Sequence, residues 1–110
     1  MTERRHNNRA EFNVLVNNTL LAKVPVGNVS EEGICFTTDK AFSKGDFLVL
    51  DFTLPGNIEI KAYGKVKWQQ QEAEGVFLNG LEFWHIEDEY KEKLAAFVKK
   101  ITSEKRHMPC

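Results

Sequence analysis

Two polar segments carry the most distinctive chemistry in this 110-residue sequence. Residues 4–9 read Arg-Arg-His-Asn-Asn-Arg, which places three guanidinium groups within six residues. Residues 28–33 read Asn-Val-Ser-Glu-Glu-Gly and follow an apolar stretch. A guanidinium group binds a phosphate through paired hydrogen bonds and also stacks on a nucleobase, whereas Asn and Ser side chains bond base edges or phosphate oxygens. Together the segments predict a site for an anionic ligand that carries a base.

Each segment also has a simpler interpretation. An Asn-x-Ser-x-x-Gly sequence is typical of a tight turn between strands, because Asn and Ser bond nearby backbone groups and Gly accepts a positive φ. A basic run at a terminus is typical of a solvated tail. Neither segment alone indicates a function.

The order of the two segments resembles a two-part family signature. Arg5-x-x-x-Arg9 followed by Asn28-x-Ser30-x-x-Gly33 resembles the RxxxR and [D/N]xSxxG motifs of PilZ domains. This resemblance implies a small β-barrel that binds the bacterial second messenger cyclic di-GMP, with contacts from these five residues. The family's alternative to Asn at the first motif position is Asp, which accepts hydrogen bonds with a full charge. We therefore expect some affinity to be lost relative to the Asp form.

The resemblance covers residues 4–101, nearly the whole chain. Further segments that fit the family are Ile34-Cys-Phe36, Lys44-Gly-Asp46, Val66-Lys-Trp68 and Gly80-Leu-Glu-Phe83. It implies no cofactor beyond the nucleotide ligand.

Arg4 and Trp68 are additional candidates for ligand contact. Arg4 is either a solvated arm residue or a third guanidinium that stacks on a second guanine, which would favour two ligand molecules over one. Trp68 ends a strand on its apolar face, so core packing is its expected role. At a barrel rim, its ring would instead lie beneath a guanine.

Hydrophobic alternation predicts the elements that position these residues. Period-two patterns predict strands at 11–16, 19–26, 34–37, 47–54, 58–69 and 76–85. Apolar residues from Ile86 to Ile101 recur at helical spacing and predict a C-terminal α-helix. The expected fold is mainly β, a small six-stranded antiparallel barrel with one helix. Its parts are a flexible basic arm (residues 1–10), the barrel with its helix (11–101) and a polar tail (102–110).

Several irregularities are expected within this barrel. Pro25 cannot donate a ladder bond, so its strand should be an edge or be bulged there. The apolar residues of the last strand change from even positions (Val76 and Leu78) to odd positions (Leu81 and Phe83), which predicts a bulge at Gly80. Residues 70–75 should form a polar loop. The side chains of Tyr63 and Trp84 alternate with those expected to face the core, so they should point outward and could form a surface patch for a partner.

Composition limits the classes of function. The chain is 42% hydrophobic and 28% charged, as in an ordinary globular domain, and its net charge of −1 argues against a DNA or RNA binder. The histidines, His6, His85 and His107, have no metal-ligand spacing, and no activated nucleophile is evident. We therefore expect neither an enzyme nor a metal site.

The expected location is cytoplasmic. Two cysteines, Cys35 and Cys110, do not make the framework of several disulfides found in small secreted domains. The N-terminal segment has no apolar signal region, and no apolar run is long enough to insert into a membrane.

Three classes of function remain open. The first is a cyclic di-GMP receptor that passes its signal to a separate, unidentified protein in motility, surface attachment or exopolysaccharide control. The second is a protein-interaction module of the same fold that does not bind the nucleotide. The third is an oligonucleotide-binding barrel of another family, for which Lys61, Lys65 and Lys67 beside Tyr63 supply only a partial basic face.

Overall fold

The computed structural model describes residues 10–102, which form six strands, a short 3₁₀ helix and an α-helix. The elements are β1 (Glu11–Val16), β2 (Thr19–Pro25), η2 (Val26–Asn28), β3 (Gly33–Thr38), β4 (Phe47–Leu54), β5 (Ile58–Ala73), β6 (Val76–His85) and α2 (Asp88–Thr102). All paired strands are antiparallel, and the sheet order is β2-β1-β4-β5-β6-β3. The prediction of a mainly β fold with six antiparallel strands and a C-terminal helix is confirmed.

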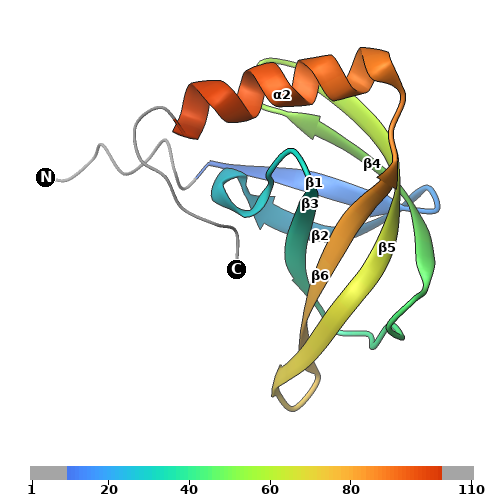
Figure 1. The fold of residues 1–110 in the computed structure, drawn as a ribbon. Helices are drawn as coiled ribbons and strands as arrows, with labels where there is room; N and C mark the ends of the chain where they lie inside the picture. The colour runs from blue at the N-terminus through green and yellow to red at the C-terminus, as the bar shows by residue number, and fades with distance from the viewer. Residues whose placement is uncertain (1–9, 103–110) are drawn as a thin grey trace, which may run out of the picture.

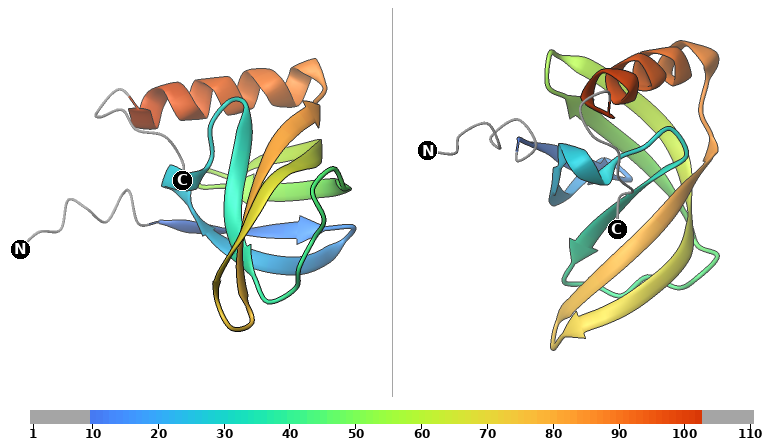
Figure 2. Two further views of the ribbon diagram at one scale, coloured as in Figure 1. Left: turned by 60° about the horizontal axis from the view of Figure 1, so that its bottom comes forward. Right: turned by 60° about the vertical axis from the view of Figure 1, so that its left-hand side comes forward.

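The sheet curls until its two edge strands approach each other, which gives a nearly closed barrel (Figures 1 and 2). An isolated bridge between Val29 and Ile34 lies in the connection that runs from β2 into β3. The helix α2 crosses one end of the barrel (Figure 1). Its Leu94, Phe97 and Val98 are buried in the same core as the strands, so the helix covers that end with its apolar stripe.

Apolar side chains at every second position of the strands fill the barrel interior. In β4, the side chains at 48, 50, 52 and 54 are all buried, as their parity predicts. Full burial of a Leu or Phe side chain contributes about 1.5–3 kcal/mol. This regular alternation therefore fixes which face of the sheet points inward.

The tight turns also follow the sequence. Asn17 and Asn18 have φ values of 53° and 70°, and they connect β1 to β2 as a two-residue hairpin. In the Ser43–Asp46 turn, the Ser43 N–H donates to Asp46 Oδ2 at 2.9 Å and Gly45 has a φ of 95°.

The prediction that the strand with Pro25 is an edge or is bulged there is confirmed, because β2 is an edge of the sheet. The register of β2 shifts next to Leu21 and not at Pro25, so Leu20 is 59% exposed. Two other expectations about irregularities were wrong. The bulge near Gly80 lies on the facing strand, because Val66 pairs with Leu81 and Trp68 with Gly80, leaving Lys67 as the extra residue.

The second correction concerns the predicted polar loop. Residues 70–73 continue β5 and pair with β6, so that the two strands form a long hairpin beyond the core (Figures 1 and 2). Backbone bonds between the strands hold this extension, and they do not require apolar side chains.

None of the helices within residues 10–102 is long and apolar enough to cross a membrane. Cys35 of β3 is buried.

Candidate functional site

The turn between η2 and β3 is built around the Ser30 side chain. Ser30 Oγ accepts hydrogen bonds from the N–H groups of Glu32 and Gly33, both at 3.2 Å, and donates to the Gly33 carbonyl at 3.3 Å. The Ser30 N–H also donates to the Gly33 carbonyl at 2.8 Å. Ser30 therefore holds the turn closed, which is the simpler of its two interpretations.

The Asn28 side chain has one amide atom, Oδ1, that is available to accept a hydrogen bond. Its Nδ2 donates to the Cys35 carbonyl at 3.2 Å and approaches Cys35 Sγ at 3.8 Å, which ties the start of the turn to β3. Its Oδ1 accepts no hydrogen bond from any residue between 10 and 102. An acceptor of this kind can receive a hydrogen bond from a base N–H.

Gly33 permits a close approach between β3 and β6. It pairs with Glu82, and a β-carbon on Gly33 would lie 2.2 Å from the Leu81 carbonyl oxygen. The residue is required for this contact with the facing backbone, since its φ lies outside the left-handed region.

A cavity of about 220 Å³ lies beside this turn. It brings together Ser30 and Gly33 from the turn and Trp68 from β5. Its full lining is Ser30, Glu32, Gly33, Ile34, Cys35, Lys67, Trp68, Gly80, Leu81 and Glu82. Apolar side chains and a tryptophan beside polar groups suit a flat aromatic ligand with polar edges.

Trp68 lies at the rim of the barrel, and the expectation of core packing was wrong. Its side chain is 38% exposed, and its indole lies over Gly80, where a β-carbon would be only 2.3 Å from the ring. The bulge at Lys67 accounts for this position, because it displaces Trp68 from the inward alternation that ends at Val66.

Lys67 and Glu82 were not among the site residues predicted from the sequence. Their side chains form an ion pair of 3.3 Å at the cavity, and both are about half exposed. An exposed pair of this kind contributes little to stability, so Lys67 can exchange its carboxylate for a ligand phosphate at small cost. Lys67 directly precedes Trp68, which is the signal that could have drawn attention to it.

The three arginines of the predicted site, Arg4, Arg5 and Arg9, lie outside the described residues. The next residue, Ala10, is placed: its carbonyl accepts a hydrogen bond of 2.9 Å from the Val26 N–H. Val26 begins η2, which leads into Asn28. Residue 10 therefore lies close to the turn that carries the second motif.

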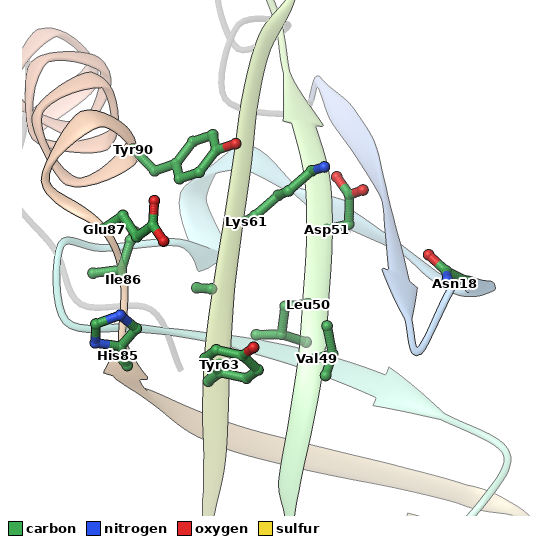
Figure 3. Close-up of a pocket in the computed structure, with 11 residues that line it drawn as sticks. Asn18, Val49, Leu50, Asp51, Lys61, Tyr63, His85, Ile86, Glu87 and Tyr90 are labelled. Carbon is green, nitrogen blue, oxygen red and sulfur yellow. The ribbon is translucent and has the colours of Figure 1, made fainter.

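A second cavity, of about 310 Å³, lies on the outer side of β4 and β5 near the start of α2 (Figure 3). Burial raises the pKa of Asp51 at this cavity, Glu59 raises it further, and Lys61 opposes the shift. Within residues 10–102, no group of three or more His, Cys, Asp or Glu side chains is placed to hold a metal ion.

Comparisons with known proteins agree with this architecture. The family model of the PilZ domain matches residues 3–100. No curated protein matches the chain. Among solved structures, the chain is similar to the Bacillus subtilis inhibitor of motility MotI/DgrA, with a TM-score of 0.70 and 19% identity. The match covers 90% of this chain and 50% of that structure, so this chain spans about half the length of its structural neighbour.

Proposed function

Because the chain belongs to the PilZ domain family, we propose that it is a bacterial receptor for cyclic di-GMP. The observation that carries the proposal is the cavity in which Ser30, Gly33 and Trp68 meet beside the motif turn. At about 220 Å³, this cavity is smaller than the roughly 300–1,000 Å³ of pockets that enclose a whole ligand. It suits one part of the dinucleotide, and the remainder requires cover from outside the cavity.

The N-terminal arginines are suited to bind the part of the dinucleotide that lies outside the cavity. Arg5 and Arg9 carry planar forks that bind phosphates in a bidentate manner or pair with the O6 and N7 atoms of guanine. The arm joins the barrel at Ala10, whose carbonyl bonds to Val26 near the motif turn. A ligand would therefore lie between the arm and the turn, with Lys67 as an additional cation for a phosphate.

The turn and Trp68 would hold the base. The exposed indole offers a flat surface on which a guanine stacks, and such stacking is worth about 1–3 kcal/mol per base. Asn28 Oδ1 would accept a hydrogen bond from the guanine N1–H or N2–H. Ser30 closes the turn, Gly33 permits the close approach of β3 to β6, and both residues line the cavity.

Arg4 bears on the number of ligands bound. A third guanidinium beside Arg5 would stack on another guanine and favour an intercalated pair of ligand molecules. A stoichiometry of two ligands per chain would support this role for Arg4, whereas one ligand per chain would contradict it.

The output is a binding event and not a chemical reaction. PilZ domains act typically as binding modules, and we propose that this one works in the cytoplasm, where an intracellular messenger would reach it. The signal would then pass to a separate protein in motility, attachment or exopolysaccharide control. The similar Bacillus subtilis protein is named for inhibition of motility, which favours motility among these processes.

Isothermal titration of cyclic di-GMP into the wild-type chain and the Arg5→Ala/Arg9→Ala variant tests the proposal. We expect saturable binding to the wild type and none to the variant, with cyclic di-AMP and GTP as ligand controls. Lys23→Ala, which removes an exposed cation from β2, is a control that should leave binding intact. Absence of binding by the wild-type chain would contradict the receptor function and leave a protein-interaction module of the same fold.

A further inference from the structure

Four large apolar side chains that do not line the ligand cavity are exposed on the outer side of the barrel. Phe47 and Val49 of β4, Tyr63 of β5 and Trp84 of β6 are each 49–58% exposed. With Lys65, they form a continuous surface that we call the outer aromatic face. An exposed apolar patch on a small domain usually marks an interaction site.

The strand register places these residues side by side. Phe47 pairs with Lys65 and Val49 with Tyr63 across β4 and β5, while Tyr63 pairs with His85 across β5 and β6. The Phe47 and Trp84 rings meet edge to face with their centroids 5.5 Å apart. Contacts among these side chains hold the surface in shape before any partner binds, which lowers the entropic cost of binding.

Lys65 gives this face a positive charge that forms no ion pair within residues 10–102. Its neighbours along the strand have carboxylate partners, since Lys61 lies 3.8 Å from Glu59 and Lys67 lies 3.3 Å from Glu82. No carboxylate within residues 10–102 reaches Lys65; its ammonium lies over the Trp84 ring at 4.8 Å and the Phe47 ring at 5.7 Å instead. A cation among aromatic rings is complementary to an acidic side chain that is flanked by apolar groups.

The cavity of about 310 Å³ opens at the edge of the same face. Val49, Tyr63 and His85 line it, and Tyr90 projects toward it from α2 (Figure 3). Its size suits one large apolar side chain. Asp51, Glu87 and Lys61 also line this cavity, and because the two carboxylates outnumber the one ammonium, a further carboxylate inside it is disfavoured. An acidic side chain would therefore bind at Lys65, with its apolar neighbour in the cavity.

We propose that the outer aromatic face is the docking surface for a partner protein segment that presents a large apolar side chain next to an aspartate or glutamate. This proposal deepens the proposed function and rests on it only for the signal that the partner receives. Glu82 connects the two surfaces, because it pairs in register with Lys65 while its carboxylate binds Lys67 at the ligand cavity.

Panning the immobilised full chain against a phage-displayed library of random dodecapeptides tests the surface. We expect the selected peptides to share an aromatic or large aliphatic residue adjacent to Asp or Glu. Their affinity should fall on the order of tenfold for Trp84→Ala and for Lys65→Glu, as for central residues of an interface. The controls Leu20→Ala and Lys23→Glu change exposed residues of β2 and should retain binding.

Three results would overturn the proposal. The first is a selected consensus without an acidic residue, or no consensus. The second is unchanged peptide affinity in Trp84→Ala, once circular dichroism shows that the variant is folded. The third is a dimer, seen by sedimentation velocity, that Trp84→Ala abolishes, because the face would then bind a second copy of the chain.

The ligand and partner sites can be tested separately. Trp84→Ala should bind the selected peptides on the order of tenfold more weakly and still bind cyclic di-GMP in the titration described above. Arg5→Ala/Arg9→Ala should show the reverse when peptide binding is measured without nucleotide. A failure of one site is thus distinguishable from a failure of the other.

Discussion

At the residue scale, two close approaches around the ligand cavity leave no room for a β-carbon. At Gly33 the obstacle is the Leu81 backbone carbonyl, whereas at Gly80 it is the indole of Trp68. A backbone carbonyl in a paired strand moves only when the pairing is disturbed, but a partly exposed ring can rotate away. Substitution at Gly33 should therefore damage the fold, and substitution at Gly80 should mainly damage the binding surface.

We predict that Gly80→Ala displaces the Trp68 ring and weakens cyclic di-GMP binding about tenfold or more, which corresponds to the roughly 1–3 kcal/mol of one stacked base. Titration calorimetry measures the affinity, and tryptophan fluorescence reports the displaced ring. Gly75→Ala is the matched control: it has open space around it at a φ of 73°, so it should lower stability and leave affinity unchanged. Equal affinity of Gly80→Ala and the wild type would contradict stacking on Trp68.

Asp51 gives a prediction about pH. Burial and Glu59 raise its pKa above 3.8 in the folded state, so its charged form is less favourable there than in the unfolded chain. This destabilising contribution is fully present above the raised pKa and is lost as the pH falls toward 3.8. Asp51→Asn should therefore raise the melting temperature at pH 7 relative to the wild type, and the difference should shrink toward pH 4.

Thermal unfolding of both proteins between pH 8 and pH 4 checks this expectation. Glu11→Gln, an exposed carboxylate on β1, serves as a control with little expected effect. A lower melting temperature for Asp51→Asn at pH 7 would show that attraction to Lys61 outweighs burial.

At the element scale, one buried amide connects the three strands that form the ligand cavity. Asn79 of β6 is completely buried. Its Nδ2 donates to the Phe36 carbonyl at 3.2 Å and to Thr38 Oγ1 at 3.0 Å, and its Oδ1 accepts from Gln69 Nε2 at 2.7 Å. These bonds hold β3, β6 and β5 together next to Gly80, which lines the cavity.

We predict that Asn79→Ala lowers the free energy of unfolding by about 1–3 kcal/mol, because it leaves buried polar partners without hydrogen bonds. Urea titration monitored by circular dichroism measures this loss. Asn13→Ala removes an exposed amide from β1 and should change stability by less than about 0.5 kcal/mol. Similar losses for the two variants would argue against the role of this network.

At the scale of the whole molecule, ligand binding and folding are linked. A ligand that binds only the folded chain adds about 2.7 kcal/mol of stability at a concentration one hundred times its Kd. The net charge of −1 is small, so under the proposed function local cations such as the arginine segment and Lys67 would attract the dinucleotide. Binding should consequently weaken as salt is added.

Thermal unfolding with and without cyclic di-GMP tests this linkage. At a hundredfold excess over Kd, we expect the melting temperature to rise on the order of 10 °C for a domain of this size. Arg5→Ala/Arg9→Ala should show no rise, and cyclic di-AMP should have no effect on the wild type. An equal rise in the double variant would place the ligand elsewhere on the barrel.

Local chemistry in the sequence was sufficient to predict much of this protein. Alternating apolar residues fixed the inward face of β4, two adjacent asparagines predicted the first hairpin, and residues at helical spacing predicted the buried stripe of α2. The two-part motif placed Ser30 and Gly33 at one turn, and the structure lines a cavity with both. These features depend on residues close together in the chain, so no knowledge of strand pairing was needed.

The tertiary structure alone decided which faces meet. One extra residue at Lys67 brings Trp68 to the rim and Lys67 to Glu82, and one near Leu21 exposes Leu20. Pairing with β6 likewise extends β5 through residues that read as a loop. Because side chains alternate along a strand, a shift of one residue exchanges inside and outside. Such shifts depend on a partner strand that is distant in sequence, so they emerge only when the barrel assembles.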